Sequence, residues 1–189
     1  MEAALSIALG LGLAAACGFR VFAPLTVVSL AARAGAVELG ANFDWIASTP
    51  ALVILIVASA AEVAAYYVPW LDNLFDTVAT PAAVVAGAVL AASVVTGMDP
   101  WLKWTLAAIA GGGLAGAVQL STVAARGASS LTTAGLGNLG VASLELVGAI
   151  GLSLLSIFWP LLALVVLAAA LLLIVRRRAR SEPPRAVPG

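Results

Sequence analysis

Long apolar stretches, separated by short polar or proline- and glycine-containing segments, occupy most of this chain of 189 residues. Hydrophobic residues make up 63% of the sequence and charged residues only 10%, and the mean hydropathy is +1.13. In lipid, a helix satisfies its backbone hydrogen bonds within one segment, and about 20 apolar residues cross the hydrocarbon core. The sequence therefore predicts an all-α, polytopic transmembrane helix bundle, formed as a single domain by residues 1–175.

The apolar stretches predict six or seven membrane spans, depending on how the first two are counted. Those two are short for a full crossing, so they are thin spans, a tight hairpin or one broken re-entrant element. Residues 127–140, which are rich in Ser, Thr, Gly and Asn, are expected to form a loop or a partly unwound segment. The expected spans cover roughly residues 3–18, 21–36, 50–67, 82–97, 104–124, 139–158 and 161–175.

One segment has the pattern of a short amphipathic helix that lies in the membrane interface instead of crossing it. In residues 69–80, apolar side chains recur at helical spacing, and Asp72 and Asp76 lie one turn apart on another face. Pro81 is expected to start the next span after this helix. The two carboxylates could hold a cation or act on a lipid headgroup, but a solvated polar face explains them as well.

Basic residues gather near the C-terminus, where four arginines lie between Arg176 and Arg180. Cytoplasmic segments next to membrane spans carry an excess of Lys and Arg, so we expect an inner-membrane protein with its C-terminus in the cytoplasm. Residues 176–189 are expected to form a basic and then proline-rich tail without a fixed structure. Elsewhere the sequence has no basic patch with interleaved aromatic residues, which argues against nucleic acid as a partner.

Arg20, Glu62 and Glu145 lie inside or at the edge of apolar stretches. A charge at membrane depth costs about 2.5–3.5 kcal/mol on insertion scales unless it faces a partner or a wet cavity. These residues are therefore candidates for a solute or ion path. Each also has a structural interpretation, since carboxylates near helix ends cap backbone amides and an arginine can reach to lipid phosphates. Weaker candidates for the same path are Arg126, Asn138 and Ser143.

The residues that are missing from the sequence limit its chemistry. There is no histidine, which removes the commonest general base and metal ligand. Cys17 is the only cysteine, so one chain can form no disulfide, and we interpret Cys17 as a buried small hydrophobic residue. We expect no cofactor, no metal and no enzymatic activity; the alternative is a lipid-modifying enzyme that uses Asp72 and Asp76. The expected partners are the lipid bilayer and a small solute or ion. The sequence is also compatible with a homo-oligomer.

Short motifs occur at three places along the chain. They are Gly18-Phe19-Arg20 with Pro24-Leu25, then Glu62 with Pro69, Asp72 and Asp76, and finally Arg126 with Asn138, Ser143 and Glu145. Together they resemble a family of small bacterial integral membrane proteins known only as a domain of unknown function. The resemblance covers residues 1–175, and it implies an architecture and a choice of site residues but no activity.

The chain departs from the pattern of that family at three positions. Tyr66-Tyr67 stands where the family tends to have Asp-Lys, Thr80-Pro81 where it has Arg-Pro, and Leu146 where it has an acidic residue. A function that needs those charges is therefore not expected in this protein.

Two functional classes follow from these residues. The first is a small-solute or ion transporter, or a channel-like protein, with a polar path near Arg20, Glu62 and Glu145. The second is a non-transporting protein with a structural, assembly or lipid-binding role. A transporter is expected to place the three charges around one hydrated cavity near the middle of the membrane, whereas a structural protein is expected to disperse them or to pair them with the backbone.

Overall fold

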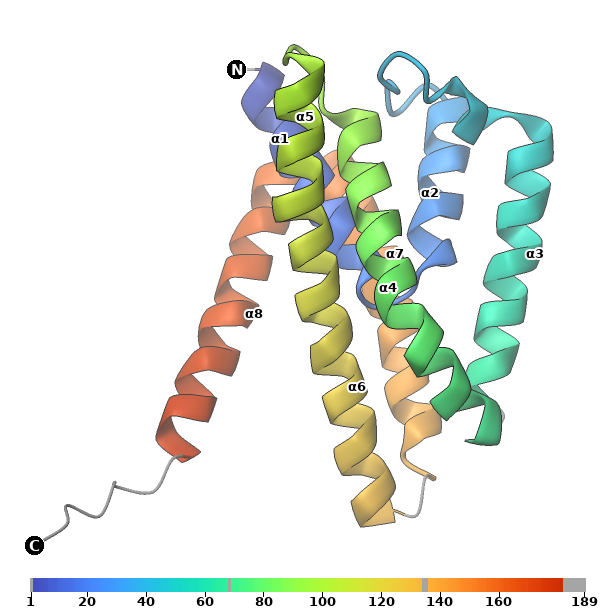
Figure 1. Ribbon diagram of the computed structural model, residues 1–189, viewed down its shortest axis with the longest axis vertical. Coiled ribbons are helices and arrows are strands. Elements are labelled where there is room, and N and C mark those ends of the chain that lie inside the picture. Colours follow the sequence, from blue (N-terminus) through green and yellow to red (C-terminus); the bar gives the residue numbers. More distant parts are fainter. Residues whose placement is uncertain (1, 68, 134–135, 182–189) are drawn as a thin grey trace, which may run out of the picture.

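The computed structural model describes residues 2–67, 69–133 and 136–181, and in these ranges all side chains except those of residues 69–76, 174–175 and 177–181 (Figure 1). The described chain is helical and contains no strand, which confirms the predicted all-α class. Its elements are α1 (Glu2–Cys17), α2 (Phe22–Arg33), the 3-10 helix η1 (Asp44–Ala47), α3 (Thr49–Tyr66), α4 (Pro69–Val94), α5 (Pro100–Leu106), the π-helix η2 (Ala107–Gly112), α6 (Gly113–Thr133), α7 (Asn138–Phe158) and α8 (Pro160–Ser181).

Four helical segments of the described chain are long and apolar enough to cross a bilayer. They are Thr49–Tyr66 in α3, Thr77–Val94 in α4, the continuous rod Pro100–Thr133, and Asn138–Phe158 in α7. The helices α1 and α2 and the part Pro160–Leu173 of α8 are apolar but shorter. The membrane class is therefore supported, whereas a count of six or seven spans is not confirmed.

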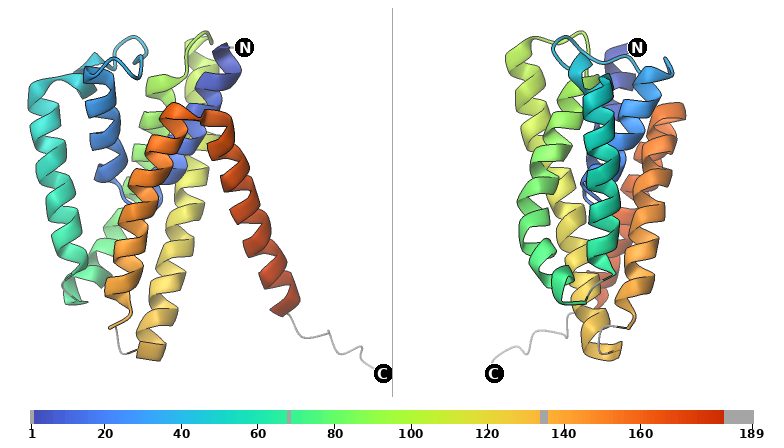
Figure 2. Two further views of the ribbon diagram at one scale, coloured as in Figure 1. Left: turned by 180° about the vertical axis from the view of Figure 1, so that it is seen from behind. Right: turned by 90° about the vertical axis from the view of Figure 1, so that its right-hand side faces the viewer.

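The helices α1 and α2 form a hairpin that enters the bundle and returns toward the same end (Figures 1 and 2). Their lengths of 16 and 12 residues correspond to about 24 and 18 Å at 1.5 Å per residue, less than the ~30 Å of a hydrocarbon core. The turn between them, residues 18–21, lies about halfway along the bundle. Of the three arrangements open for the first two segments, the structure has the tight hairpin, and its turn lies inside the bundle.

Small residues let the hairpin pack into the interior of the bundle. The second half of α1 is buried against α4, α6, α7 and α8, and Cys17 is fully buried there, as predicted. At Gly18 an added Cβ would lie 2.5 Å from the carbonyl oxygen of Ala115, so only glycine fits beside α6. At Gly87 in α4 an added Cβ would lie 2.5 Å from the Cβ of Ala115. Such close helix contacts are typical of membrane interfaces rich in small residues.

The helix α4 corrects one of the sequence predictions. The segment 69–80 is not a separate interfacial helix, because the helix continues through Pro81 to Val94. Proline removes one backbone hydrogen bond and bends a helix without necessarily ending it, and the lower part of α4 turns away from its upper part in Figure 1. The sequence predicted a helix break because proline often ends a helix. In the folded bundle the helix continues past Pro81 nevertheless.

Two further helix boundaries differ from the sequence prediction. The helix α6 continues to Thr133, so most of the segment 127–140 is helical and not unwound. There Thr132 and Thr133 donate hydrogen bonds to the carbonyl groups of Ala128 and Ser129, one turn earlier. The helix α8 likewise continues to Ser181, beyond the predicted start of the tail, and residues 182–189 lie outside the described part.

Candidate functional site

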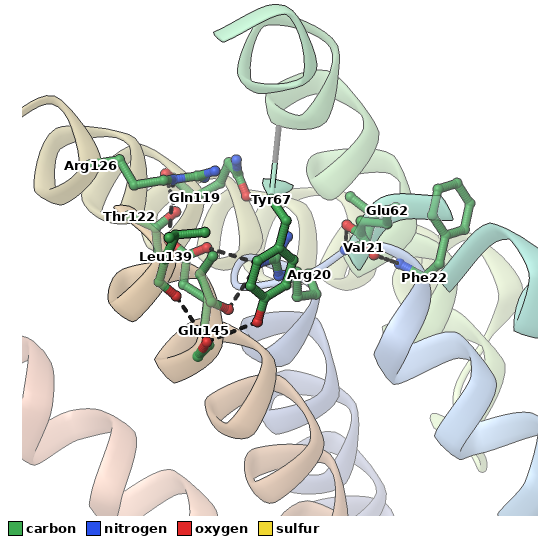
Figure 3. Close-up of polar contacts among 12 residues, drawn as sticks. Arg20, Val21, Phe22, Glu62, Tyr67, Gln119, Thr122, Arg126, Leu139 and Glu145 are labelled. Atoms are coloured by element: carbon green, nitrogen blue, oxygen red, sulfur yellow. Dashed lines mark hydrogen bonds and ion pairs between the residues drawn. The ribbon is translucent and has the colours of Figure 1, made fainter. Parts of the chain in front are cut away.

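Three of the predicted charged residues meet beside the turn of the hairpin. Arg20 comes from the turn, Arg126 from α6 and Glu145 from α7 (Figure 3). Arg20 Nη2 lies 3.7 Å from Glu145 Oε2, and Arg126 Nε lies 3.3 Å from Glu145 Oε1. The side chains are 1%, 2% and 4% exposed, respectively. We refer to these three residues as the charged cluster.

Arg20 makes further contacts that hold it in place. Its Nη2 donates a hydrogen bond of 2.9 Å to the carbonyl oxygen of Ala142 in α7. Its Nε and Nη1 have no hydrogen-bond partner among the described residues. Because the side chain is buried, those two nitrogen atoms face protein and not bulk solvent.

The ring of Tyr66 lies against both guanidinium groups. The Cζ atoms of Arg20 and Arg126 are 3.8 and 4.4 Å from the ring centroid. A cation over an aromatic face is stabilised by about 0.5–2 kcal/mol, most strongly when it is shielded from water. Sequence analysis noted Tyr66 only as a departure from a family pattern. Its position one turn after Glu62 on α3 was the available signal that it faces the same site.

Glu62 is buried close by, but it binds the backbone of the hairpin. Its two carboxylate oxygens accept hydrogen bonds of 2.7 and 3.1 Å from the N–H groups of Val21 and Phe22 (Figure 3). These N–H groups lie at the start of α2, where the first turn of a helix has no internal acceptors and the helix dipole favours a negative charge. Glu62 therefore stabilises a helix end that stops inside the bundle.

Two residues on α6 that the sequence analysis did not single out belong to the site. Gln119 and Thr122 precede Arg126 by seven and four residues, and all three are buried on one face of the helix (Figure 3). The Nε2 atom of Gln119 has no hydrogen-bond partner in the described part of the chain. The polar positions repeat at helical spacing, which was the signal that could have identified them.

The other predicted residues lie outside the charged cluster. Ser143 Oγ is 2.9 Å from the hydroxyl of Tyr67, which connects α7 with the end of α3. Asn138 Nδ2 donates to Ser130 Oγ at 2.9 Å, near the ends of α6 and α7. The side chains of Asp72 and Asp76 lie outside the described residues. Among the side chains that are described, no three of His, Cys, Asp and Glu gather in one place.

Glu145 also lines a cavity of about 280 Å³ between α6, α7 and α8. Most of the cavity wall is apolar, and Phe19 from the turn of the hairpin closes one side. Ser121, Thr122 and Glu145 are the polar residues among those that line it. Glu145 thus contacts both this cavity and the two arginines, and its carboxylate oxygens are buried.

Apolar helices of membrane-spanning length around buried charges define the protein as an integral membrane protein with a helical bundle. The chain belongs to the family described as a domain of unknown function, DUF4126, whose model matches residues 7–180. The resemblance to a family known only as a domain of unknown function is therefore confirmed. No curated protein and no solved structure matches the chain.

Proposed function

We propose that this protein passes a small solute or an ion through its helix bundle, and that the charged cluster is the binding site on this path. The proposal treats the hairpin of α1 and α2 as re-entrant: its turn lies about halfway along the bundle and brings Arg20 next to Glu145 and Arg126. Charges inside a membrane protein are costly and commonly mark substrate paths, ion paths or proton relays. Transporters often build such sites from helices that are interrupted within the membrane.

The proposed setting is a bacterial inner membrane with the C-terminus in the cytoplasm. The arginines between Arg176 and Arg180 support this orientation, because positive residues next to a span are retained on the cytoplasmic side. The helix α1 begins at the end of the bundle opposite to the end where α8 finishes, so the start of α1 would face the outside (Figure 1). We propose a role in binding and passage and no catalytic step.

A second candidate function is structural, and the contacts of Glu62 favour it. Both carboxylate oxygens bind the backbone at the start of α2, and Arg20 also donates to a backbone carbonyl. In this alternative the buried charges hold the hairpin in the bundle and bind no solute. The two candidates differ in one property, which is the access of water to the charged cluster.

Water access can be measured with a thiol at Thr122, which lies beside the cluster and lines the cavity. Thr122→Cys is nearly isosteric, and it is combined with Cys17→Ala and treated with a small membrane-impermeant thiol reagent in whole cells and in inverted vesicles. Transport requires a water-filled path, so we expect the cysteine at position 122 to react from at least one side. Two controls define the range of thiol reactivity. The wild-type protein carries native Cys17, which is fully buried, and Leu131→Cys places a thiol at a largely exposed position at the end of α6.

The result separates the two candidates. Reaction at position 122 together with protection of native Cys17 supports the proposed path. If position 122 reacts from neither side while Leu131→Cys is labelled, the cluster is sealed and the structural function replaces the transport proposal.

A further inference from the structure

Glu145 bridges the two arginines through different oxygen atoms. Its Oε1 lies 3.3 Å from Arg126 Nε, and its Oε2 lies 3.7 Å from Arg20 Nη2. Strong hydrogen bonds between charged nitrogen and oxygen groups measure about 2.7–2.9 Å. The single carboxylate thus faces two guanidinium groups, at distances longer than those of a close, bidentate pair.

Arg20 keeps hydrogen-bonding capacity in this arrangement. Its Nε and Nη1 are buried without a hydrogen-bond partner in the described part of the chain, and the same holds for Nε2 of Gln119. Leaving a buried donor without an acceptor is unfavourable, and more so when the donor is charged. These atoms all carry hydrogen, so the group that would satisfy them must supply acceptor atoms.

We propose that Arg20 and Arg126 bind an oxyanion, which is a carboxylate or a phosphate group. The carboxylate of Glu145 competes with this oxyanion for the two arginines. The planar fork of a guanidinium matches the two oxygens of such groups better than it matches a spherical ion. This inference rests on the proposed function, because it names the class of solute that the charged cluster takes. It assigns to Glu145 the role of occupying the arginines while no oxyanion is bound.

The cavity that Glu145 lines offers space into which its side chain can turn, although the carboxylate oxygens are buried beside the arginines in this structure. It measures about 280 Å³ and touches Glu145, Thr122 and Ser121. When the carboxylate swings toward it, the positive charges of Arg20 and Arg126 are no longer compensated by Glu145. The apolar wall also suits an acyl chain, so the oxyanion could be free or could be the headgroup of an anionic lipid.

The test compares wild-type protein with Glu145→Gln, which keeps the size of the side chain but removes the competing charge. Purified full-length protein in a maltoside detergent is titrated with sodium phosphate or sodium acetate, with sodium chloride holding the ionic strength constant. Thermal unfolding reports binding, because a ligand that binds only the folded state raises the midpoint. We expect Glu145→Gln to bind at least one of these anions about tenfold more tightly than wild type, which corresponds to 1.4 kcal/mol.

A second arm identifies the source of the oxyanion. Dioctanoyl phosphatidic acid replaces the salts, with dioctanoyl phosphatidylcholine as the zwitterionic control. A tighter response of Glu145→Gln to phosphatidic acid alone supports the proposal with a lipid as ligand, and a response to the salts supports it with a free anion. Arg20→Gln is expected to abolish the response, whereas Arg33→Gln, at the exposed end of α2, keeps it.

The proposal is overturned if folded Glu145→Gln binds phosphate, acetate and phosphatidic acid no more tightly than wild type does. That result does not depend on whether Arg20→Gln folds. It also differs from a failure of the transport proposal, since a water-accessible cluster without an oxyanion response rejects only the inference about the solute. A sealed cluster with the expected response rejects transport and keeps the binding site.

Discussion

At the scale of single residues, Glu62 holds the turn of the hairpin by accepting hydrogen bonds from the N–H groups of Val21 and Phe22. Glu62→Gln keeps the size of the side chain, but its amide has one acceptor oxygen in place of two. We expect the free energy of unfolding to fall by about 1–3 kcal/mol, since a buried donor loses a charged partner. Thermal unfolding of the detergent-purified protein measures this loss.

The matched control for that substitution is Glu38→Gln, because Glu38 is exposed in the loop after α2. Surface substitutions usually change stability by less than about 0.5 kcal/mol. Equal unfolding midpoints for the two variants would mean that Glu62 does not cap α2.

At the scale of helices, the packing of α4 against α6 and α1 depends on glycine. An added Cβ at Gly87 would lie 2.5 Å from the Cβ of Ala115 and 3.2 Å from the carbonyl oxygen of Gly111. At Gly113, one helix away, an added Cβ meets nothing within 4 Å. We expect Gly87→Ala to lower the free energy of unfolding by about 1–3 kcal/mol through overpacking.

Gly113→Ala is the comparison for that change, and it should leave stability unchanged or raise it by up to about 1 kcal/mol, because alanine is the better helix former. Both variants are followed by the same thermal unfolding measurement. A Gly87→Ala protein as stable as the Gly113→Ala protein would contradict the close contact between α4 and α6.

The helices also show what the sequence could and could not predict. Apolar length and composition predicted the helical class, and the cost of buried charge identified Arg20 and Glu145. Proline and glycine indicate only that a helix can be interrupted locally. They therefore did not predict that α4 continues through Pro81, or that the turn of the hairpin lies inside the bundle. Those outcomes depend on contacts between distant segments.

The same reason explains the missed site residues. Tyr66 carries no charge, and its contact with two guanidinium groups arises only when α3 packs against α2 and α7 and the side chains of Arg20 and Arg126 reach its ring. Gln119 is likewise an ordinary polar residue until the face of α6 that it shares with Arg126 is buried. A sequence alone identifies a costly charge more readily than the neutral groups that surround it.

At the scale of the whole molecule, the functional proposals require the turn of the hairpin to lie inside the bilayer. The structure has α1 and α2 on the same side of that turn (Figure 2), and we propose that the chain enters and leaves the membrane there without crossing it. If both helices crossed as thin spans, the turn at Phe19 and Arg20 would instead lie at the membrane surface.

The most direct test of this central claim is the depth of a nitroxide attached at Phe19→Cys, with Cys17→Ala, in reconstituted bilayers. Phe19 also lines a wholly apolar pocket between α7 and α8, together with Leu152 and Leu167, so a label directed there samples the hydrocarbon region. The ratio of collisions with oxygen to collisions with a water-soluble nickel complex measures depth. We expect the ratio at position 19 to match the ratio for a label at Val57, an exposed apolar position within α3. A ratio that matches the one for a label at Leu131, at the end of α6, would contradict the re-entrant hairpin.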